Sequence, residues 1–413
     1  MTRPLRIDDL WAIPQLSDPQ ISPYGRHVTY VVTSPDRDKD EPASRIWVVD
    51  VETGSGRPYT SGPADAAPRW SPDGETIAFV SKRGDEELPQ LWTLPFRGGE
   101  PRRLTTIDGA VSEPTWSPNG RVLAFTALVD VTARGDKQEK ERAKSAPQVI
   151  RGGPYRMDGL GRIGGLRKHL FFVGVDGGDL TAVVEGDGFV ASPAWSPDGE
   201  RIAYVDPGVI FDLEPIAPVY VVRSSGGAPT RITEDERFHG TPTWWPDGDA
   251  LLTVAADVVV GGHARLFRVP ATGGRPEQVA PSFDRNVMVG EVGYPGGPPA
   301  FARDGRRILF CARDRGCTHV YEADPRSGET RKLIGGDDRV VAGMTTNGTR
   351  MALIVATPAT TGEIHVADAD GSADRQLTTH FADALPDVKL RSPEPRTFTA
   401  RDGTTLHGWL LRG

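Results

Sequence analysis

Short apolar runs alternate with polar turns along the whole chain, and this pattern predicts a structure built almost entirely from β-strands. A run rich in β-branched and aromatic residues follows a Gly-containing turn again and again, as in TIAFVS, VLAFTA, RIAYVD and RILFCA. Each run is too short for an ordinary helix and is bounded by Gly, Pro, Asn or Asp, as expected of strands.

The turn before each apolar run is Trp-Ser-Pro-Asp-Gly or a relative of it. Ser accepts local hydrogen bonds, Pro fixes φ at the second position, Asp or Asn suits the third and Gly the fourth, which indicates a type I turn between antiparallel strands. The intervals between successive turns are 49, 46, 79, 49, 57 and 43 residues. A period of about 40 to 50 residues with several strands is typical of propeller blades. The seven turns end at Gly25, Gly74, Gly120, Gly199, Gly248, Gly305 and Gly348.

A third strand, such as RIWVVDV or HLFFVGV, and a fourth, such as RRLTT or RQLTT, follow in each repeat. Four antiparallel strands form one blade, and a ring of blades buries both faces of every sheet. The sequence therefore predicts an all-β, seven-bladed β-propeller of four-stranded antiparallel blades over residues 1–390. The segment IDDLW predicts a short helix before the first blade. Aromatic residues are expected to fill the space between blades at Trp70, Trp116, Trp195, Trp244 and Phe301.

The long third interval contains an insertion, residues 128–168, in the third blade. Its first part, ARGDKQEKERAKSAP, has mixed charge and indicates a solvated helix or loop. The second part is rich in glycine, and loops on a rigid scaffold often carry function. Arg151, Tyr155, Arg156 and Asp158 are therefore candidates for binding a substrate, an anionic group or a partner domain. Alternatively, the loop is purely structural and is held by its own Arg–Asp pairs.

Composition narrows the classes of function. The net charge of −8 argues against a nucleic-acid partner. No apolar run is long enough to cross a membrane, and the first residues lack the apolar core of a signal peptide. Cys311 and Cys317 fit no metal or redox motif. We expect two reduced thiols on neighbouring strands, with a disulfide as the other possibility, and a cytoplasmic location.

The usual signatures of catalysis are missing from the sequence. There is no G-x-S-x-G nucleophile motif, no phosphate-binding loop and no H-E-x-x-H metal motif. We therefore predict no catalytic residue, no metal site and no cofactor in this chain. The eight histidines do not cluster and are expected at the surface or in turns: His27, His169, His239, His263, His319, His365, His380 and His407.

Residues 391–413 differ from the repeats. An extended, Pro-containing linker leads into RTFTARDGTTLHGWLL, in which Asp402-Gly403 indicates the turn of a hairpin. A hairpin of two strands with an apolar end is not stable alone. We expect it to be the first part of another domain.

The WSPDG repeats, the IDDLW start, the PYRMDGLG insertion and the TFTARDGTTLHGWLL tail together resemble the N-terminal part of a prolyl oligopeptidase family serine peptidase. The branch that it is most similar to contains the acylaminoacyl-peptidases and dipeptidyl-aminopeptidase-like enzymes. The resemblance implies a propeller that admits short peptides to an α/β-hydrolase domain, of which residues 391–413 are the linker and first strands. The Ser-Asp-His triad of that domain would lie beyond residue 413, so the chain would not be catalytic by itself.

Two other interpretations remain open at this point. One is a stand-alone, TolB-like propeller that binds protein partners, but it predicts a periplasmic signal and leaves the final hairpin unexplained. The other is a propeller enzyme such as a lyase or lactonase, which needs histidines and carboxylates clustered in a central channel.

Overall fold

The computed structural model describes residues 2–38, 40–84, 86–132, 155–208, 216–257, 262–290 and 294–412. These residues form two compact units, which we describe separately. Unit 1 comprises Met1–Trp70, His263–Leu266 and Gln278–Gly413, and unit 2 comprises Ser71–Gly262 and Phe267–Glu277. Nearly all of the regular structure in both units is β-strand, as the sequence predicts.

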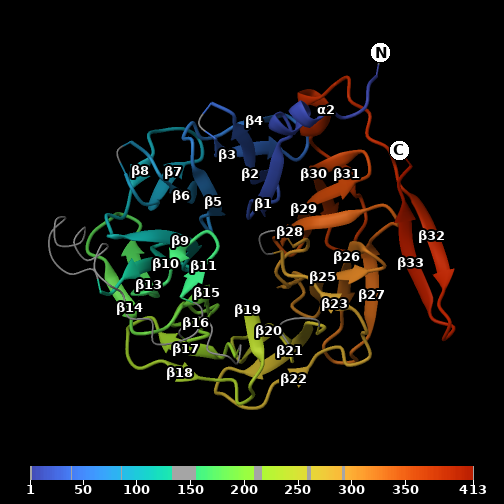
Figure 1. Cartoon of the computed structure of the whole chain (residues 1–413). Helices are drawn as coiled ribbons and strands as arrows, with labels where there is room; N and C mark the ends of the chain where they lie inside the picture. Colours follow the sequence, from blue (N-terminus) through green and yellow to red (C-terminus); the bar gives the residue numbers. More distant parts are fainter. Residues whose placement is uncertain are drawn as a thin grey trace. The chain divides into compact units, whose positions relative to one another are not determined.

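The first part of unit 1 begins with the short 3-10 helix η1 (Ile7–Trp11), so the helix predicted at IDDLW is confirmed. One antiparallel sheet follows, in the order β1-β2-β3-β4 (Figure 1). Its strands are β1 (Gln15–Ile21), β2 (His27–Asp36), β3 (Glu41–Asp50) and β4 (Gly56–Pro58), and β5 (Asp65–Trp70) is the next strand along the chain.

The second part of unit 1 holds two antiparallel groups of strands, which a single parallel pair, Thr318↔Val340, joins into one sheet. The first group is β23 (Asn286–Val287), β24 (Ala300–Phe301), β25 (Ile308–Asp314), β26 (Cys317–Ala323) and β27 (Thr330–Ile334). The second group is β28 (Val340–Thr346), β29 (Arg350–Thr357), β30 (Thr360–Asp368) and β31 (Arg375–Gln376). Helix α2 (His380–Ala384) and the hairpin of β32 (Glu394–Thr399) and β33 (Thr405–Leu410) complete the unit.

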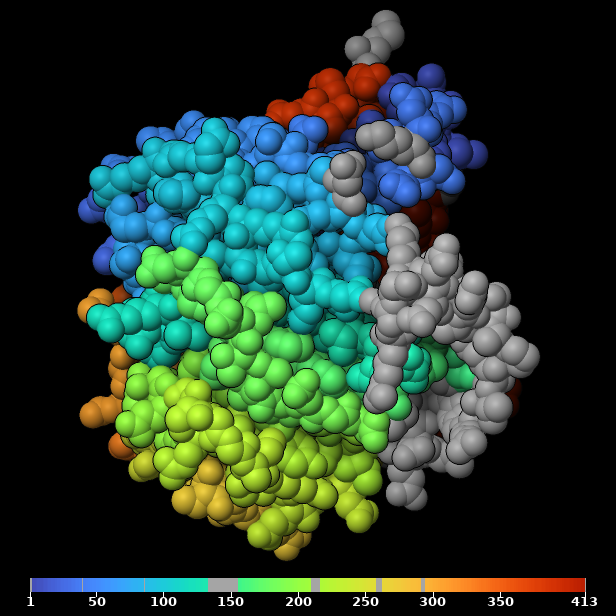
Figure 2. Space-filling model, turned by 90° about the vertical axis from the view of Figure 1, so that its left-hand side faces the viewer, coloured from blue at the N-terminus to red at the C-terminus, as the bar shows by residue number. Residues whose placement is uncertain are grey.

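Unit 2 begins with the antiparallel strands β6 (Thr76–Ser81), β7 (Gln90–Pro95) and β8 (Arg102–Arg103). A sheet in the order β14-β13-β10-β9 follows, from β9 (Gly109–Trp116), β10 (Val122–Asp130), β13 (Leu166–Gly174) and β14 (Thr181–Val184). The next sheet has β15 (Ala191–Trp195), β16 (Arg201–Val205), β17 (Val219–Arg223) and β18 (Thr230–Arg231). The last has β19 (Phe238–Trp244), β20 (Ala250–Ala256), β21 (Arg265–Pro270) and β22 (Glu277–Gln278), of which Arg265, Leu266 and Gln278 are assigned to unit 1. Figure 2 shows the surface of this unit, coloured from light blue through green to yellow along the sequence.

The repeated turn has the geometry that the sequence predicts. At Ser71–Gly74, the Gly74 amide donates to the carbonyl oxygen of Ser71 at 2.9 Å, and Gly74 has a φ of +69°. The Ser71 hydroxyl donates to Asp73 and accepts from the amide of Thr76. The same bonds recur at Ser117 and Ser196, so one short sequence builds the same link between the first two strands of different sheets.

The repeated tryptophan contacts the preceding sheet. The indole Nε1 of Trp70 donates to the carbonyl oxygen of Gln20 at 3.1 Å. Trp195 and Trp244 donate in the same way to Thr115 and Ala194, at 3.3 and 2.9 Å. For these three residues the predicted packing between sheets is confirmed, and the hydrogen bond adds a directional contact to it.

A bulge in the first strand of five of the sheets was not predicted. Five non-glycine residues in these strands have φ between 47° and 53°, and a proline follows each of them. The strand register shifts beside the bulges of β1, β9, β15 and β19. A left-handed conformation costs a non-glycine residue about 1 kcal/mol, so tertiary packing must offset strain at each of these bulges. A tryptophan lies three positions after four of the five residues, and Ile21 lies three positions after Asp18. The five residues are Asp18, Ala67, Glu113, Ser192 and Thr241.

The first and last sheets of the chain pack against each other within unit 1, although they share no strand. Strand β1 contacts β28, β29 and β30, and one apolar cluster contains Val28, Tyr30 and Val49 from the first sheet with Ile354 and Val366 from the last. Side chains of the last sheet also bond to backbone groups of the first, as when the Thr345 hydroxyl accepts from the Ile21 amide at 3.1 Å.

Polar contacts around helix α2 reinforce this packing. The buried carboxylate of Glu363 on β30 accepts hydrogen bonds from the Thr378 hydroxyl and from the amides of His380 and Phe381, at 2.6, 3.0 and 2.8 Å. The His380 ring in turn lies 2.9 Å from the hydroxyl of Tyr30 and packs edge-on against Trp47. Glu363 and His380 thus link the last sheet to the first.

Replacing Glu363 with Ala leaves three buried donors without their acceptor. We expect the Glu363→Ala variant to lose about 3 kcal/mol of unfolding free energy in urea titrations. Glu329, an exposed carboxylate in a turn of the same unit, provides the control, and Glu329→Ala should change stability by less than about 0.5 kcal/mol. Equal effects of the two substitutions would contradict the role assigned to Glu363.

Acid is expected to weaken this packing. Burial lowers the pKa of His380, and it also lowers the pKa values of His27, His239 and His319. The unfolded chain then binds more protons than the folded chain below pH about 6.5, so the unfolding free energy should fall as the pH drops from 7 to 5. In the His380→Gln variant, the unfolding free energy should fall less between pH 7 and pH 5 than it does in the wild-type chain. His263→Gln, at a half-exposed histidine, should keep the wild-type slope.

Candidate functional site

The described part of the insertion forms a small β-hairpin next to the sheet of β9, β10, β13 and β14. Strand β10 pairs with β13 as far as Asp130↔Leu166, so the insertion connects these two strands. Strands β11 (Arg156–Met157) and β12 (Gly161–Arg162) pair antiparallel. Between them, Gly159 has a φ of +81°, which a residue with a Cβ rarely adopts.

The hairpin presents three of the four predicted site residues to solvent. Tyr155 is 57% exposed, and Arg156 and Asp158 are exposed as well. Arg151 lies outside the described residues. Arg156 pairs directly across the strands with Arg162, and no ion pair joins Arg156, Asp158 or Arg162 to another residue in the part of the chain that the structure describes. Two opposed guanidinium groups and one aromatic ring are well suited to contact an anionic or peptide partner.

The base of the hairpin is closed by its own backbone, and the sheet beside it is braced by a partly buried polar cluster. Ile163 is buried, and its amide donates to the carbonyl oxygen of Tyr155 at 3.0 Å. At the adjacent bulge, Glu113 Oε2 accepts from Lys168 Nζ at 2.8 Å and from the Thr126 hydroxyl at 2.9 Å. The bulge therefore aims a carboxylate at the root of the insertion. The X-Pro pair at 113–114, repeated before each tryptophan, is the sequence signal that points to this arrangement.

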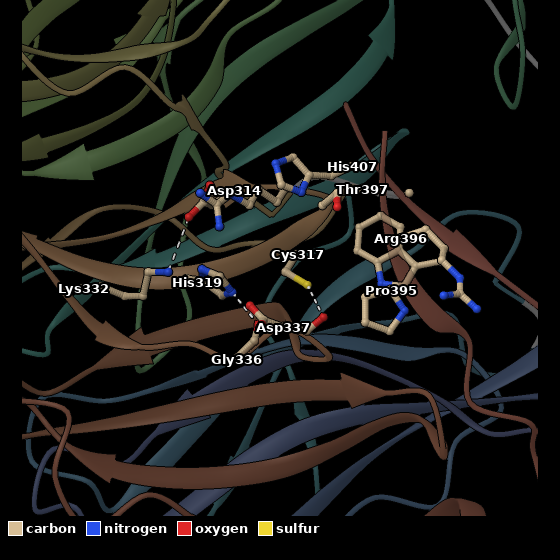
Figure 3. A pocket seen from close by; sticks show the side chains of 13 residues that line it. Asp314, Cys317, His319, Lys332, Gly336, Asp337, Pro395, Arg396, Thr397 and His407 are labelled. Carbon is tan, nitrogen blue, oxygen red and sulfur yellow. Dashed lines mark hydrogen bonds and ion pairs between the residues drawn. The ribbon is translucent and has the colours of Figure 1, made fainter. Parts of the chain in front are cut away.

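The second candidate site is a pocket in unit 1, which was not predicted from the sequence. A pocket of about 270 Å³ lies between β25–β27 and the hairpin β32–β33. Figure 3 shows Cys317, His319 and Lys332 on the side of the sheet and Pro395, Arg396 and Thr397 on the side of the hairpin. The pocket also includes Asp314, Arg315, Gly336, Asp337, His407, Gly408 and Trp409.

Charged groups on the sheet side of this pocket neutralise one another. The Asp314 carboxylate forms ion pairs with Arg285 Nε at 3.0 Å and with Lys332 Nζ at 3.4 Å. Burial would raise the pKa of Asp314, but these two cations outweigh it and hold the pKa below its ordinary value. Burial raises the pKa of Tyr321, beside this cluster, to about 12. Asp314 is therefore a fixed anion rather than a proton donor.

The buried wall of the pocket is held by two bonds to the loop after β27. His319 Nε2 donates to the carbonyl oxygen of Gly336 at 2.8 Å, and the Cys317 thiol donates to that of Asp337 at 3.3 Å. Burial lowers the pKa of His319 and raises that of Cys317. Cys317 and Cys311 are free thiols on the paired strands β26 and β25, as the sequence predicts.

Three histidines are buried, so the prediction that all eight lie at the surface or in turns is wrong for them. His169 and His319 each bind a carbonyl oxygen seventeen residues ahead. His239 lies 2.8 Å from Asp235 Oδ1 and 3.0 Å from the Thr253 hydroxyl. This Asp-His-Thr arrangement resembles a catalytic triad, but Thr253 and His239 are fully buried and no substrate can reach them. Its role is structural.

The two described helices, η1 and α2, have five residues each, and no helix in the described chain is long and apolar enough to cross a membrane.

Comparison with known proteins identifies relatives with peptidase names. The chain is 32% identical over 206 residues to the uncharacterized peptidase YuxL of Bacillus subtilis, which covers 49% of this chain and 31% of the relative. It is 25% identical over 346 residues to dipeptidyl-peptidase 5 of Porphyromonas gingivalis, which covers 78% of this chain and 48% of the relative. The chain thus spans at most about half the length of these curated relatives.

The fold is similar to part of a larger solved structure. An acylaminoacyl peptidase in complex with Z-Gly-Gly-Phe-chloromethyl ketone matches with a TM-score of 0.74 and 18% identity, over 97% of this chain and 58% of that one. The model of the PD40 family, the TolB beta propeller domain, matches residues 13–138 and 164–397. Because this match covers most of the sequence, the chain belongs to the family of TolB β-propeller domains.

Proposed function

We propose that the chain is the substrate-gating propeller of an oligopeptide-cleaving serine peptidase of the acylaminoacyl- or dipeptidyl-peptidase type. The observation that carries the proposal is that this chain is similar to only part of a longer peptidase. The match covers 97% of this chain but 58% of the acylaminoacyl peptidase. The remaining part of such a protein would supply the catalytic domain. By itself the chain would select peptides and not cleave them.

The strand groups support an arrangement of seven blades over residues 1–390. Four-stranded sheets begin at β1, β5, β9, β15 and β19, and the two groups joined at Thr318↔Val340 supply the sixth and seventh blades. The sixth blade has an interrupted first strand, since β23 and β24 both pair with β25. In this proposal, the packing of β1–β4 on β28–β31 closes a ring without a shared strand.

The hairpin β32–β33 supports the presence of a further domain. Phe398, Leu406, Leu410 and Leu411 are between 42% and 62% exposed. An apolar surface of this kind on a two-stranded hairpin favours burial against another layer. We propose that residues 391–413 lead into an α/β-hydrolase domain, which would be the partner of the propeller.

The insertion supplies the proposed contact with substrate. Tyr155, Arg156 and Asp158 are exposed on the hairpin β11–β12, and we propose that Arg151 acts with them. A cationic and aromatic surface would orient short peptides through their carbonyl and carboxylate groups, and a ring of blades would exclude folded proteins. The two free, buried thiols favour a reducing compartment, and we propose the cytoplasm.

A TolB-like interaction propeller is the second candidate function, because the matching family model describes that domain. In this case the exposed hairpin β11–β12 would bind a protein and not a peptide substrate.

The first experiment compares the chain with and without the protein encoded downstream of it. We expect the longer protein to hydrolyse chromogenic acyl-aminoacyl or dipeptidyl substrates and the 413-residue chain to hydrolyse none. Short peptides should be cleaved and a folded protein should not. A downstream sequence without a serine hydrolase, or turnover by the chain alone, would overturn the proposal.

The second experiment tests the hairpin β11–β12 in the longer protein. Arg156→Ala should raise the KM for peptides with acidic side chains about fivefold and leave kcat unchanged, since it removes an exposed ionic contact made in ground state and transition state alike. Arg326→Ala, at an exposed arginine in the turn after β26, is the matched control and should leave KM unchanged. Equal KM values for both variants would place substrate recognition elsewhere.

A further inference from the structure

Trp409 of the C-terminal hairpin, β32–β33, contacts the turn between β25 and β26. The ring of Trp409 lies directly over Gly316, and a Cβ built on Gly316 would come within 2.5 Å of Trp409 Cζ3 and 3.3 Å of Cζ2. No side chain other than hydrogen fits at position 316 while Trp409 is in place. We refer to this site as the Gly316 notch.

The notch follows from the tight turn between β25 and β26. Asp314 pairs with Cys317, so only Arg315 and Gly316 make the turn, with φ values of 52° and 81°. Such a two-residue turn requires positive φ at both positions and strongly favours glycine. The absence of a side chain then leaves a flat backbone surface, and an indole ring covers it.

Apart from Trp409, the hairpin is weakly attached. Among the described residues, no hydrogen bond or ion pair links β32–β33 to β25, β26 or β27. The space beside the notch is the 270 Å³ pocket and not a packed interface. Arg396 pairs with Glu394, and Asp314 pairs with Arg285 and Lys332, so the charges on each side are satisfied without the other.

The two faces of the hairpin differ in the way that this attachment requires. Side chains alternate along each strand, and Pro395, Thr397, His407 and Trp409 share one face. The opposite face has Phe398, Leu406 and Leu410, which are exposed. The hairpin therefore directs one large ring to the sheet and leaves its more apolar face free.

We propose that the C-terminal hairpin is a strap with a docked and a released position, and that the insertion of Trp409 over the Gly316 notch determines which one is occupied. Docking covers the buried wall of the pocket, and Cys317 is only 5% exposed there. Release uncovers this wall without unfolding the sheet, because the strands β25–β27 keep all of their own bonds. This inference concerns contacts within unit 1 only.

The test measures alkylation of Cys317 by iodoacetamide in the folded chain, with Cys311 as an internal reference. Cys311 is fully buried on β25, and burial raises its pKa to about 12, so it reacts only when the sheet opens. We expect Trp409→Ala to speed the alkylation of Cys317 about tenfold and to leave the alkylation rate of Cys311 unchanged. This result would indicate local opening without global unfolding. Phe398→Ala, an aromatic substitution on the opposite face, should change neither rate.

A double-mutant cycle separates loss of docking from strain at the turn. Gly316→Ala should speed alkylation of Cys317 as Trp409→Ala does, and the double variant should react no faster than either single one. Gly208→Ala is the control for backbone strain, because Gly208 has a φ of +73° and open space around it. Unchanged labelling in Trp409→Ala, additive effects in the double variant, or equal effects of Gly316→Ala and Gly208→Ala would overturn the proposal.

Discussion

The packing of the first sheet against the last is the contact on which unit 1 depends. Each sheet has two apolar faces, and a face left in water would cost the chain the stabilisation of its core. The sheets β1–β4 and β28–β31 come from opposite ends of the sequence and share no strand. Apolar packing and hydrogen bonds between side chains of one sheet and backbone groups of the other hold them together. The buried hydrogen bonds of Glu363 and the contacts of His380 give this apolar packing a defined register.

Along the rest of the chain, a short repeated motif of bulge, tryptophan and turn positions a sheet against the one before it. The turn at Ser71–Gly74 sets the direction of the second strand, and the bulge at Ala67 redirects the first. Trp70 then reaches a carbonyl group of the preceding sheet. Because the strained bulge, the turn and the indole lie within eight residues, each repeat contains the means of positioning itself against its neighbour.

The two exposed hairpins, β11–β12 and β32–β33, occur where the chain departs from this repeated motif. The insertion extends the β10–β13 connection into a hairpin with exposed Tyr155 and Arg156, and Glu113 and Lys168 form an ion pair in the sheet beside it. At the other end of the chain, the ring of Trp409 on the hairpin β32–β33 lies against Gly316 of the neighbouring sheet. In both places an exposed hairpin lies beside a sheet whose strands keep their own hydrogen bonds.

The sequence by itself determined the strands, the turns and their repetition, because hydrophobic periodicity and the Ser-Pro-Asp-Gly pattern report the local backbone. It also predicted the hairpin at Asp402-Gly403, the helix at IDDLW and the reduced state of Cys311 and Cys317. Only the tertiary structure decided which histidines are buried, how Glu363 is satisfied and that Trp409 meets Gly316. These contacts join residues far apart in the sequence, and no local pattern encodes a distance through space.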